Sequence, residues 1–322
     1  MTEQHARYNL ADRERVKTLE RTKMLVIAGC GLLGTSVARA YREQFNATET
    51  LIVGIDSNPI ALTEARGLAV YDHLYSSPSD LRAQLAPLAE QVIGIVATPP
   101  AFIAQTVHEL APFCDLVMDV GSIKVPVVDA LAKLASKADP GTNSVDNFVP
   151  CHPMAGSHQQ GPGSSASELF VGHWVFVLEG SAARPELTAL AHAFWQSLGA
   201  RTQDIDAQAH DAAVAYTSHL PHLLAAAYMA VETPDVAAAG AGFMEFTRLA
   251  KANPEMWSQV LQANQAAWRP VLARYIESLQ GLEALIEQGD VDAIRAYLSA
   301  RRDERIELEA KTRHPESGYH DG

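Results

Sequence analysis

The stretch Lys23-Met-Leu-Val-Ile-Ala-Gly-Cys-Gly-Leu-Leu-Gly34 decides the fold of this chain. Its first part is an apolar run typical of a buried strand, and it leads directly into glycines at positions 29, 31 and 34. A helix is expected at residues 35–43, and a second buried strand, Leu51–Ile55, leads into Asp56. A strand, a glycine turn, a helix and an acid 22 residues after the last glycine form the pattern of a dinucleotide-binding unit.

Each residue of this motif has a chemical reason for its position. Gly29 permits the tight turn, Gly31 lets the backbone approach a pyrophosphate, and Gly34 allows the helix to pack closely on the strand. The pyrophosphate then lies at the helix N-terminus, where free N–H groups bind anions. Asp56 would accept hydrogen bonds from ribose hydroxyls and repel a 2′-phosphate, and no Arg or Lys follows it directly. The motif therefore predicts NAD rather than NADP.

The rest of the chain divides into two kinds of pattern. Apolar runs at residues 92–97, 116–120, 148–151 and 174–178 alternate with helical segments, which is typical of a parallel sheet covered on both faces. From residue 185 onward long helical patterns dominate, at 185–198, 207–232, 256–286 and 291–309, beside one short strand at 202–205. We predict an α/β protein with a doubly wound, Rossmann-type domain at 23–180 and an all-α domain at 181–310. Residues 1–22 are expected to be flexible and 311–322 to form a loose tail.

Composition argues against several classes of protein. The 322 residues carry 25 Lys+Arg against 38 Asp+Glu, a formal charge of −13, so no basic surface for nucleic acid is expected. Apolar residues make up 48%, enough for a packed core, but no run reaches the length of a membrane span. The three scattered cysteines, Cys30, Cys114 and Cys151, predict neither a disulfide framework nor a metal site and suit a reducing cytoplasm.

Two segments that follow later strands are rich in reactive side chains. The first runs from Asp119 to Lys124 and contains Ser122, and the second runs from Cys151 to His158 and contains His152. Both should lie at the carboxyl edge of the sheet, where ligands of α/β proteins bind. His152 is suited to be a general base, and Ser122 to hydrogen-bond His152 or the cofactor. Cys151 and His152 should point to opposite faces of their strand, which argues against a cysteine–histidine nucleophile pair.

The helical half adds His219, His222 and Arg248. The two histidines, three residues apart, share a helix face, and Pro221 between them should kink the helix. A metal site is one interpretation, but no third ligand is apparent, and substrate binding or core packing is favoured. Arg248 suits a carboxylate, although a surface ion pair, for example with Glu245, is the favoured interpretation when Arg248 is taken alone. An apolar stripe from Leu272 to Leu282 indicates either a dimer interface or ordinary core.

Taken together, these motifs resemble the prephenate/arogenate dehydrogenase family of tyrosine biosynthesis. The resemblance covers residues 23–305, and the segments that carry it stand in the family's order: the glycine loop, Ala97-Thr-Pro-Pro100, Asp119-Val-Gly-Ser-Ile-Lys124, His152-Pro-Met-Ala-Gly156, Ser218-His-Leu-Pro-His222, Phe246-Thr-Arg248 and Asn253-Pro-Glu-Met-Trp257. It implies a Rossmann domain, a helical domain that builds a homodimer, and an active site in the cleft between them.

The resemblance also implies roles for individual residues. His152 matches the catalytic histidine, Ser122 the serine that bonds it, and Arg248 the arginine that holds a substrate carboxylate. His222 and His219 match substrate-binding histidines, and Trp257 matches a tryptophan that can reach a neighbouring subunit's site. The chain departs from the family's pattern at Ser157-His158, where an acid commonly stands, and at Glu245, where an Asp often stands. The lost acid favours prephenate over the amino acid arogenate.

We therefore predict an NAD-dependent oxidative decarboxylation of prephenate, a dianion, in a cytoplasmic homodimer that binds neither nucleic acid nor membrane. Arogenate, 4-amino-4-deoxyprephenate, a β-hydroxyacid substrate and an NAD-binding redox sensor stay as alternatives. The predicted catalytic residues are His152 and Ser122, and the substrate site comprises Arg248, His222, His219, Ser157, His158 and Trp257. The predicted cofactor site comprises Gly29, Gly31, Leu32, Leu33, Gly34, Asp56, Thr98, Pro99 and Ser122, and no metal is expected. Positive charge in the site is expected from Arg248, the two histidines and Lys124.

Overall fold

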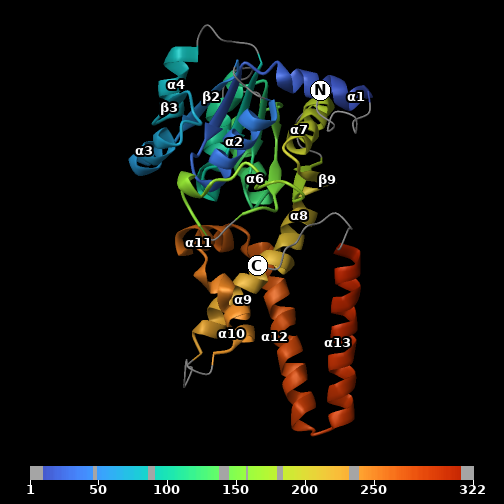
Figure 1. Cartoon of the computed structure of the whole chain (residues 1–322). Helices are drawn as coiled ribbons and strands as arrows, with labels where there is room; N and C mark the ends of the chain where they lie inside the picture. Colours follow the sequence, from blue (N-terminus) through green and yellow to red (C-terminus); the bar gives the residue numbers. More distant parts are fainter. Residues whose placement is uncertain are drawn as a thin grey trace.

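The computed structural model describes residues 10–45, 49–85, 91–137, 145–156, 159–179, 184–231 and 239–312. Strands and helices alternate through the N-terminal half (Figure 1). They are β1 (Met24–Ala28), α2 (Leu32–Phe45), β2 (Leu51–Ile55), α3 (Pro59–Gly67), β3 (His73–Tyr75), α4 (Pro78–Leu85), β4 (Val92–Val96), α5 (Pro100–Leu110), β5 (Leu116–Asp119), α6 (Val125–Ala135) and β6 (Phe148–Val149).

The six strands form one parallel sheet in the order β3-β2-β1-β4-β5-β6. This is the doubly wound order, so the predicted Rossmann-type fold is confirmed. Alternate residues of β1 enter different cores: Leu25 and Ile27 join one apolar cluster, while Met24 and Val26 join the other. The strand order reverses between β1 and β4, and ligands of such sheets bind at the carboxyl ends of these strands.

A second, three-stranded sheet consists of β7 (Cys151–Pro153), β8 (Trp174–Leu178) and β9 (Arg201–Ile205). The sequence pattern predicted one strand at 148–151, but β6 and β7 belong to different sheets. Pro150 separates them because it has no N–H to donate to a strand ladder. The switch between sheets at Pro150 gives His152 a place beside the helical half.

The expected domain boundary at residue 180 falls inside the N-terminal packing unit. Helix α7 (Pro185–Ser197) buries Leu187, Phe194 and Trp195 in the same cluster as Leu25 and Ile27. Strand β9 then completes the second sheet. The packing therefore places the change of architecture after Ile205.

The N-terminal segment expected to be flexible contains helix α1 (Leu10–Glu20). Leu19 is fully buried, and its carbonyl oxygen accepts a hydrogen bond from the Tyr41 hydroxyl at 2.7 Å. At the other end of the chain α13 continues to Thr312, and residues 313–322 of the expected tail lie outside the described part of the chain.

The helical region lies to one side of the sheets and ends in a long antiparallel hairpin, α12–α13 (Figure 1). Its helices are α8 (Ala207–Val214), a π-helical turn (Ala215–His219), α9 (Leu220–Met229), α10 (Ala241–Thr247), a 3₁₀ turn (Arg248–Lys251), α11 (Pro254–Ala263), α12 (Gln265–Glu287) and α13 (Val291–Thr312). No helix in the described ranges is both long and apolar enough to cross a bilayer.

Two helices expected to be continuous are interrupted. The pattern at 207–232 breaks into α8, the π-helical turn and α9, because Pro221 cannot donate the backbone hydrogen bond of a regular turn. The pattern at 256–286 breaks at Asn264, between α11 and α12. Helix α11 also packs back onto the N-terminal domain, where Val260 joins the cluster of Met24 and Val26.

Candidate active site

The glycine loop between β1 and α2 needs glycine at two positions and leaves open space at a third. Gly29 has a φ of +100°, and a Cβ there would lie 2.4 Å from the carbonyl oxygen of Ala97. A Cβ at Gly34 would lie 2.0 Å from the carbonyl oxygen of Gly29. At Gly31, in contrast, such a Cβ would meet no described atom within 4 Å apart from its neighbours along the chain. Open space beside the start of a helix suits a phosphate group.

The two strands beside β1 carry the other predicted cofactor residues. Just after β2, Asp56 accepts hydrogen bonds from the backbone N–H groups of Cys30 at 2.9 Å and Asn58 at 2.8 Å. After β4, the buried Thr98 Oγ1 has no hydrogen-bond partner among the described residues. Leu32 and Leu33 begin α2, and Pro99 directly precedes α5, so all of these residues border the sheet's carboxyl edge. The open space at Gly31 and the unpartnered Thr98 hydroxyl fit a bound dinucleotide.

His152 lies on β7, paired with Phe176 of β8, and is 9% exposed. Its Nδ1 lies 2.8 Å from Nε2 of His210, a fully buried residue in the first turns of α8. Nδ1 of His210 in turn lies 2.8 Å from Oδ1 of Asp211. The predicted base therefore contacts His210 and, through it, Asp211, two helical residues that the sequence patterns did not single out.

Burial lowers the pKa of His152 well below its ordinary value, and the neighbouring His210, Lys124 and His219 add to this effect. The imidazole is therefore neutral at neutral pH, which is the form that accepts a proton. The neighbouring Cys151 is fully buried, and burial raises its pKa to about 12. A thiol with this pKa stays protonated and does not act as a nucleophile at neutral pH.

Lys124 does not supply positive charge to a ligand, contrary to the expectation from the sequence. Its side chain is fully buried, and Nζ donates hydrogen bonds to Oδ2 of Asp119 at 2.6 Å and to the carbonyl oxygen of Cys151. Asp119 also accepts from the backbone N–H groups of Gly121 and Cys151. This buried ion pair holds the end of β5 against the start of β7.

Ser122 lies half-buried in the loop after β5. The expected hydrogen bond between Ser122 and His152 is absent among the described residues, where His152 is bonded to His210 instead. The Ser122 hydroxyl thus remains available for a cofactor or substrate. Ser157 and His158, which were also predicted for the site, lie outside the described residues.

The π-helical turn before Pro221 brings both predicted histidines to one side of α11. His222 stacks on the Trp257 ring with a centroid distance of 3.6 Å, and the buried His219 lies edge-on to the same ring at 5.8 Å. His222 Nδ1 donates to the carbonyl oxygen of Ser218 at 2.9 Å, which leaves its Nε2 as an acceptor. Trp257, expected to reach a neighbouring subunit, packs here on histidines of its own chain.

The two histidines are neutral groups rather than the cations expected from the sequence. Burial lowers the pKa of His219 to about 4, although the carboxylate of Asp211 opposes the shift. Burial also lowers the pKa of His222, and the nearby Arg248 adds to this effect. Arg248 is exposed at the start of the 3₁₀ turn and forms no ion pair with any described residue, Glu245 included. Of the four expected cations, only Arg248 presents a positive charge to a ligand.

The lowered pKa of His219 predicts that acid destabilises the fold. Below pH 6.5 the unfolded chain binds a proton at this histidine, whereas the folded chain does so only near pH 4. The free energy of unfolding therefore falls as the pH falls through this window, by about 2 kcal/mol between pH 8 and pH 5 from His219 alone. Urea unfolding at fixed protein concentration should show that His219→Gln loses about 2 kcal/mol less than the wild type over this range. Equal losses in the two proteins would contradict the assignment, and the exposed His73→Gln serves as the control.

Two family models match the chain. Residues 37–204 match the model described as prephenate dehydrogenase, nucleotide-binding domain. Residues 206–300 match the model described as prephenate dehydrogenase, dimerization domain. The two matches meet at Ile205, where β9 ends and the helical region begins.

Individual relatives have related descriptions. The chain is 29% identical over 304 residues to the cyclohexadienyl dehydrogenase of Zymomonas mobilis, covering 91% of this chain and 97% of that protein. It is 27% identical to the prephenate dehydrogenase of Bacillus subtilis, covering 87% of this chain and 75% of that protein. Among solved structures, prephenate dehydrogenase from A. aeolicus in complex with hydroxyphenyl propionate and NAD⁺ matches with a TM-score of 0.77 at 24% identity, covering 89% and 98% of the two chains. The arogenate dehydrogenase of Synechocystis matches with a TM-score of 0.70 at 24% identity, covering 88% and 99%.

Proposed function

This chain belongs to the prephenate dehydrogenase family, and on that basis we propose that it catalyses the NAD-dependent oxidative decarboxylation of prephenate to 4-hydroxyphenylpyruvate in tyrosine biosynthesis. The observation that carries the proposal is the buried, neutral His152, in a chain that also has a glycine loop fitted to a dinucleotide and an exposed Arg248 in its helical region. The related A. aeolicus protein holds NAD⁺, which supports the choice of cofactor.

The reaction assigns a task to each part of the site. Bound NAD supplies the hydride acceptor. His152 takes the proton of the substrate's ring hydroxyl through Nε2, because its Nδ1 is occupied by His210. The departing carboxylate leaves its bonding electrons in the ring, which becomes aromatic, so the protein needs to supply orientation more than an electron sink. Ser122 lies in the loop after β5, where its hydroxyl can orient the cofactor or substrate.

The substrate's carboxylates need a cation that water does not fully screen. Arg248 provides a planar fork that matches a carboxylate, and the His222–Trp257 stack provides a flat wall beside it. His219 is 1% exposed and packs edge-on against the Trp257 ring. We therefore assign it a positioning role rather than direct substrate contact.

The burial of Lys124 argues against a β-hydroxyacid dehydrogenase. Such an enzyme would need a lysine that reaches the substrate, whereas Lys124 is fully buried against Asp119. An NAD-binding sensor without turnover would need neither a neutral base nor a free arginine. The combination of His152 and Arg248 therefore favours catalysis.

The identity of the substrate can be tested by comparing prephenate, arogenate and 4-amino-4-deoxyprephenate at equal concentration with NAD. The absorbance of reduced nicotinamide reports turnover. We expect the highest kcat/KM with prephenate. Higher kcat/KM with either amino compound would transfer the same chemistry to that substrate, and absence of turnover with all three would overturn the proposal.

The carboxylate of Asp56 predicts selectivity for NAD over NADP. It is held beside the glycine loop by two backbone N–H groups, where a 2′-phosphate would meet its negative charge. Replacing Asp56 with serine should lower kcat/KM for NAD and raise it for NADP, changing their ratio by about 10-fold or more. Steady-state kinetics with both cofactors measures this ratio, with Ser57→Ala as the control. An unchanged ratio would remove Asp56 from the ribose site.

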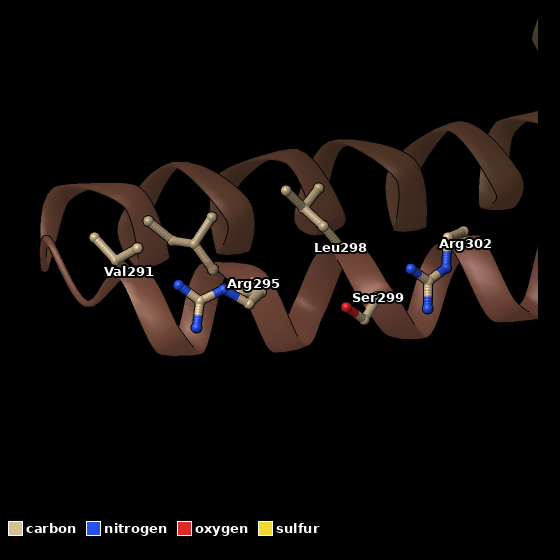
Figure 2. A pocket seen from close by; sticks show the side chains of 6 residues that line it. Val291, Arg295, Leu298, Ser299 and Arg302 are labelled. Carbon is tan, nitrogen blue, oxygen red and sulfur yellow. The ribbon is translucent and has the colours of Figure 1, made fainter.

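We also propose that the helical region forms a homodimer, as its match to a dimerization domain suggests. Of the apolar stripe on α12, Leu272 and Tyr275 pack within the chain, whereas the hairpin leaves other apolar side chains exposed: Ile276, Leu279, Ile286, Val291, Leu298 and Ile306. Figure 2 shows Val291 and Leu298 on one face of α13 beside Arg295, Ser299 and Arg302, where they line a shallow hollow. The three cysteines are free and buried, which fits the cytoplasmic location that we propose.

A further inference from the structure

Three side chains from the two halves of the molecule form one hydrogen-bonded row. Asp211 Oδ1 lies 2.8 Å from His210 Nδ1, and His210 Nε2 lies 2.8 Å from His152 Nδ1. His210 is fully buried, Asp211 is 2% exposed and His152 is 9% exposed, so water competes little for these bonds. The row ends at His152 Nε2, the atom assigned above to take the substrate's proton.

The carboxylate at the start of the row fixes the direction of each hydrogen bond. Asp211 accepts from the backbone N–H groups of Lys124 at 2.8 Å and Val125 at 2.9 Å, so it is an acceptor throughout. His210 must therefore carry its proton on Nδ1. A histidine with that single ring proton has a lone pair on Nε2 and accepts there, so His152 must donate from Nδ1. This leaves the lone pair of His152 on Nε2.

We propose that Asp211 and His210 are positioning residues that hold His152 in the Nδ1–H tautomer and so present its Nε2 lone pair to the substrate. The inference rests on the proposed function only for the identity of the substrate, because the tautomer itself is a property of the free protein. In the reaction, the proton of the substrate hydroxyl moves to His152 Nε2, and the side chain of His152 becomes an imidazolium. The hydrogen on the hydroxyl-bearing carbon leaves with its electron pair as hydride to NAD, and the oxygen forms a C=O bond. Loss of the carboxylate as carbon dioxide leaves its electron pair in the ring and gives a phenolate, which takes the proton back from His152, so no proton leaves the row.

The same carboxylate joins the two halves of the enzyme. Asp211 belongs to α8, but the N–H groups it binds lie at the start of α6 in the N-terminal half, two and three residues after Ser122. Its backbone carbonyl also accepts from the side-chain amide of Asn264, which lies 3.3 Å from His219 Nδ1. One residue thus sets the orientation of the base and the position of the loop that carries Ser122.

Replacing Asp211 with asparagine tests which atom donates and which accepts in each hydrogen bond of the row. Oδ1 of Asp211 serves both His210 Nδ1 and the Lys124 N–H, and Oδ2 serves the Val125 N–H, so an amide with its NH₂ group at the Oδ1 position keeps only the Val125 bond and presents a donor to His210. His210 would then carry its proton on Nε2 and donate to His152, which would be forced into the Nε2–H tautomer. The equivalent change behind the catalytic histidine of serine proteases lowers kcat about 10⁴-fold. We expect kcat to fall about 10²- to 10⁴-fold, with the KM for prephenate and the Kd for NAD nearly unchanged.

Substitutions of His210 test the same proposal independently if the Asp211→Asn protein does not fold. Glutamine can place its side-chain oxygen where Nε2 of His210 lies and accept from His152 Nδ1, whereas leucine of similar size cannot. His210→Gln should therefore retain at least about 10-fold more kcat than His210→Leu. Equal kcat in the two variants, with both folded, would overturn the proposal.

The tautomer itself can be observed without turnover, by ¹⁵N NMR of the histidine-labelled protein. The His152 signals are identified by their loss in His152→Asn. We expect a protonated Nδ1 and an unprotonated Nε2 in the wild type, and the reverse in Asp211→Asn. A protonated Nε2 in the wild type, or the same tautomer in both proteins, would overturn the proposal. Because no substrate is added, this result is independent of whether prephenate is the substrate.

Discussion

Replacing His152 with asparagine should lower kcat about 10²- to 10⁴-fold while the Kd for NAD stays nearly unchanged. Burial holds the pKa of His152 well below its ordinary value, so the wild-type ring is ready to accept a proton at neutral pH. Asparagine can keep one polar contact with His210 but has no basic nitrogen. Steady-state kinetics gives kcat, and quenching of tryptophan fluorescence gives the affinity for NAD.

The matched control is His73→Asn, which makes the same change at an exposed histidine on β3. This variant should keep the wild-type kcat. A His152→Asn enzyme that also kept it would remove His152 as the base, whatever its effect on KM. Loss of NAD binding in His152→Asn would show instead that the substitution disturbs the nucleotide site.

Replacing Arg248 with alanine should raise the KM for prephenate about 100-fold with a much smaller change in kcat. Lys124 is buried in an ion pair, and lowered pKa values keep His219 and His222 uncharged, so Arg248 is the cation of this group that can meet a carboxylate. Its charge matters more because the protein as a whole carries −13 and should not attract a dianion. Arg248→Lys should give an intermediate KM, because an ammonium keeps the charge but loses the two-pronged geometry.

Lys251→Ala is the matched control for Arg248, since it removes an exposed positive charge from the same 3₁₀ turn. It should leave the KM within a small factor of the wild-type value. Equal effects of Arg248→Ala and Lys251→Ala would mean that the turn acts only through long-range charge. An unchanged KM in Arg248→Ala would remove this residue from the substrate site.

The N-terminal fold could be predicted because its deciding signals are local. The strand, glycine turn and acid follow one another within residues 24–56. Two of the glycine requirements are local as well, the positive φ of Gly29 and the closeness of Gly34 to the carbonyl oxygen of Gly29. The strands of a parallel sheet are buried on both faces, so each appears as a short apolar run. These signals predicted the doubly wound fold but not the edge strand β3, because its sequence His-Leu-Tyr contains no apolar run.

The breaks within the expected helices and within the expected strand at 148–151 were harder to predict, because they depend on contacts between residues far apart in the sequence. Periodicity alone gave one helix over 256–286, but Asn264 interrupts it and uses its amide to bond the Asp211 carbonyl 53 residues away. The apolar run at 148–151 gave one strand, whereas its two halves pair with different neighbours. The presence of Pro150 and Pro221 was the visible sign in the sequence that a regular element would not continue.

The sequence singled out candidate site residues one by one, but it did not show which of them are hydrogen-bonded to each other. Ser122 was paired with His152 on the basis of the resemblance, while the structure pairs His152 with His210, which lies 58 positions along the chain. No spacing rule relates residues so far apart. An adjacent histidine and aspartate, His210-Asp211, near the start of an otherwise alanine-rich helix was the available signal, since such polar groups are rarely buried without partners.

The central claim, oxidation coupled to decarboxylation at His152, can be tested in one reaction mixture. Wild-type protein, NAD and prephenate are incubated, and reduced nicotinamide, carbon dioxide and 4-hydroxyphenylpyruvate are measured in the same sample. We expect equal molar amounts of the three products, formed at least about 100-fold more slowly with His152→Asn. Reduced nicotinamide without carbon dioxide, or equal product formation by the variant, would contradict it.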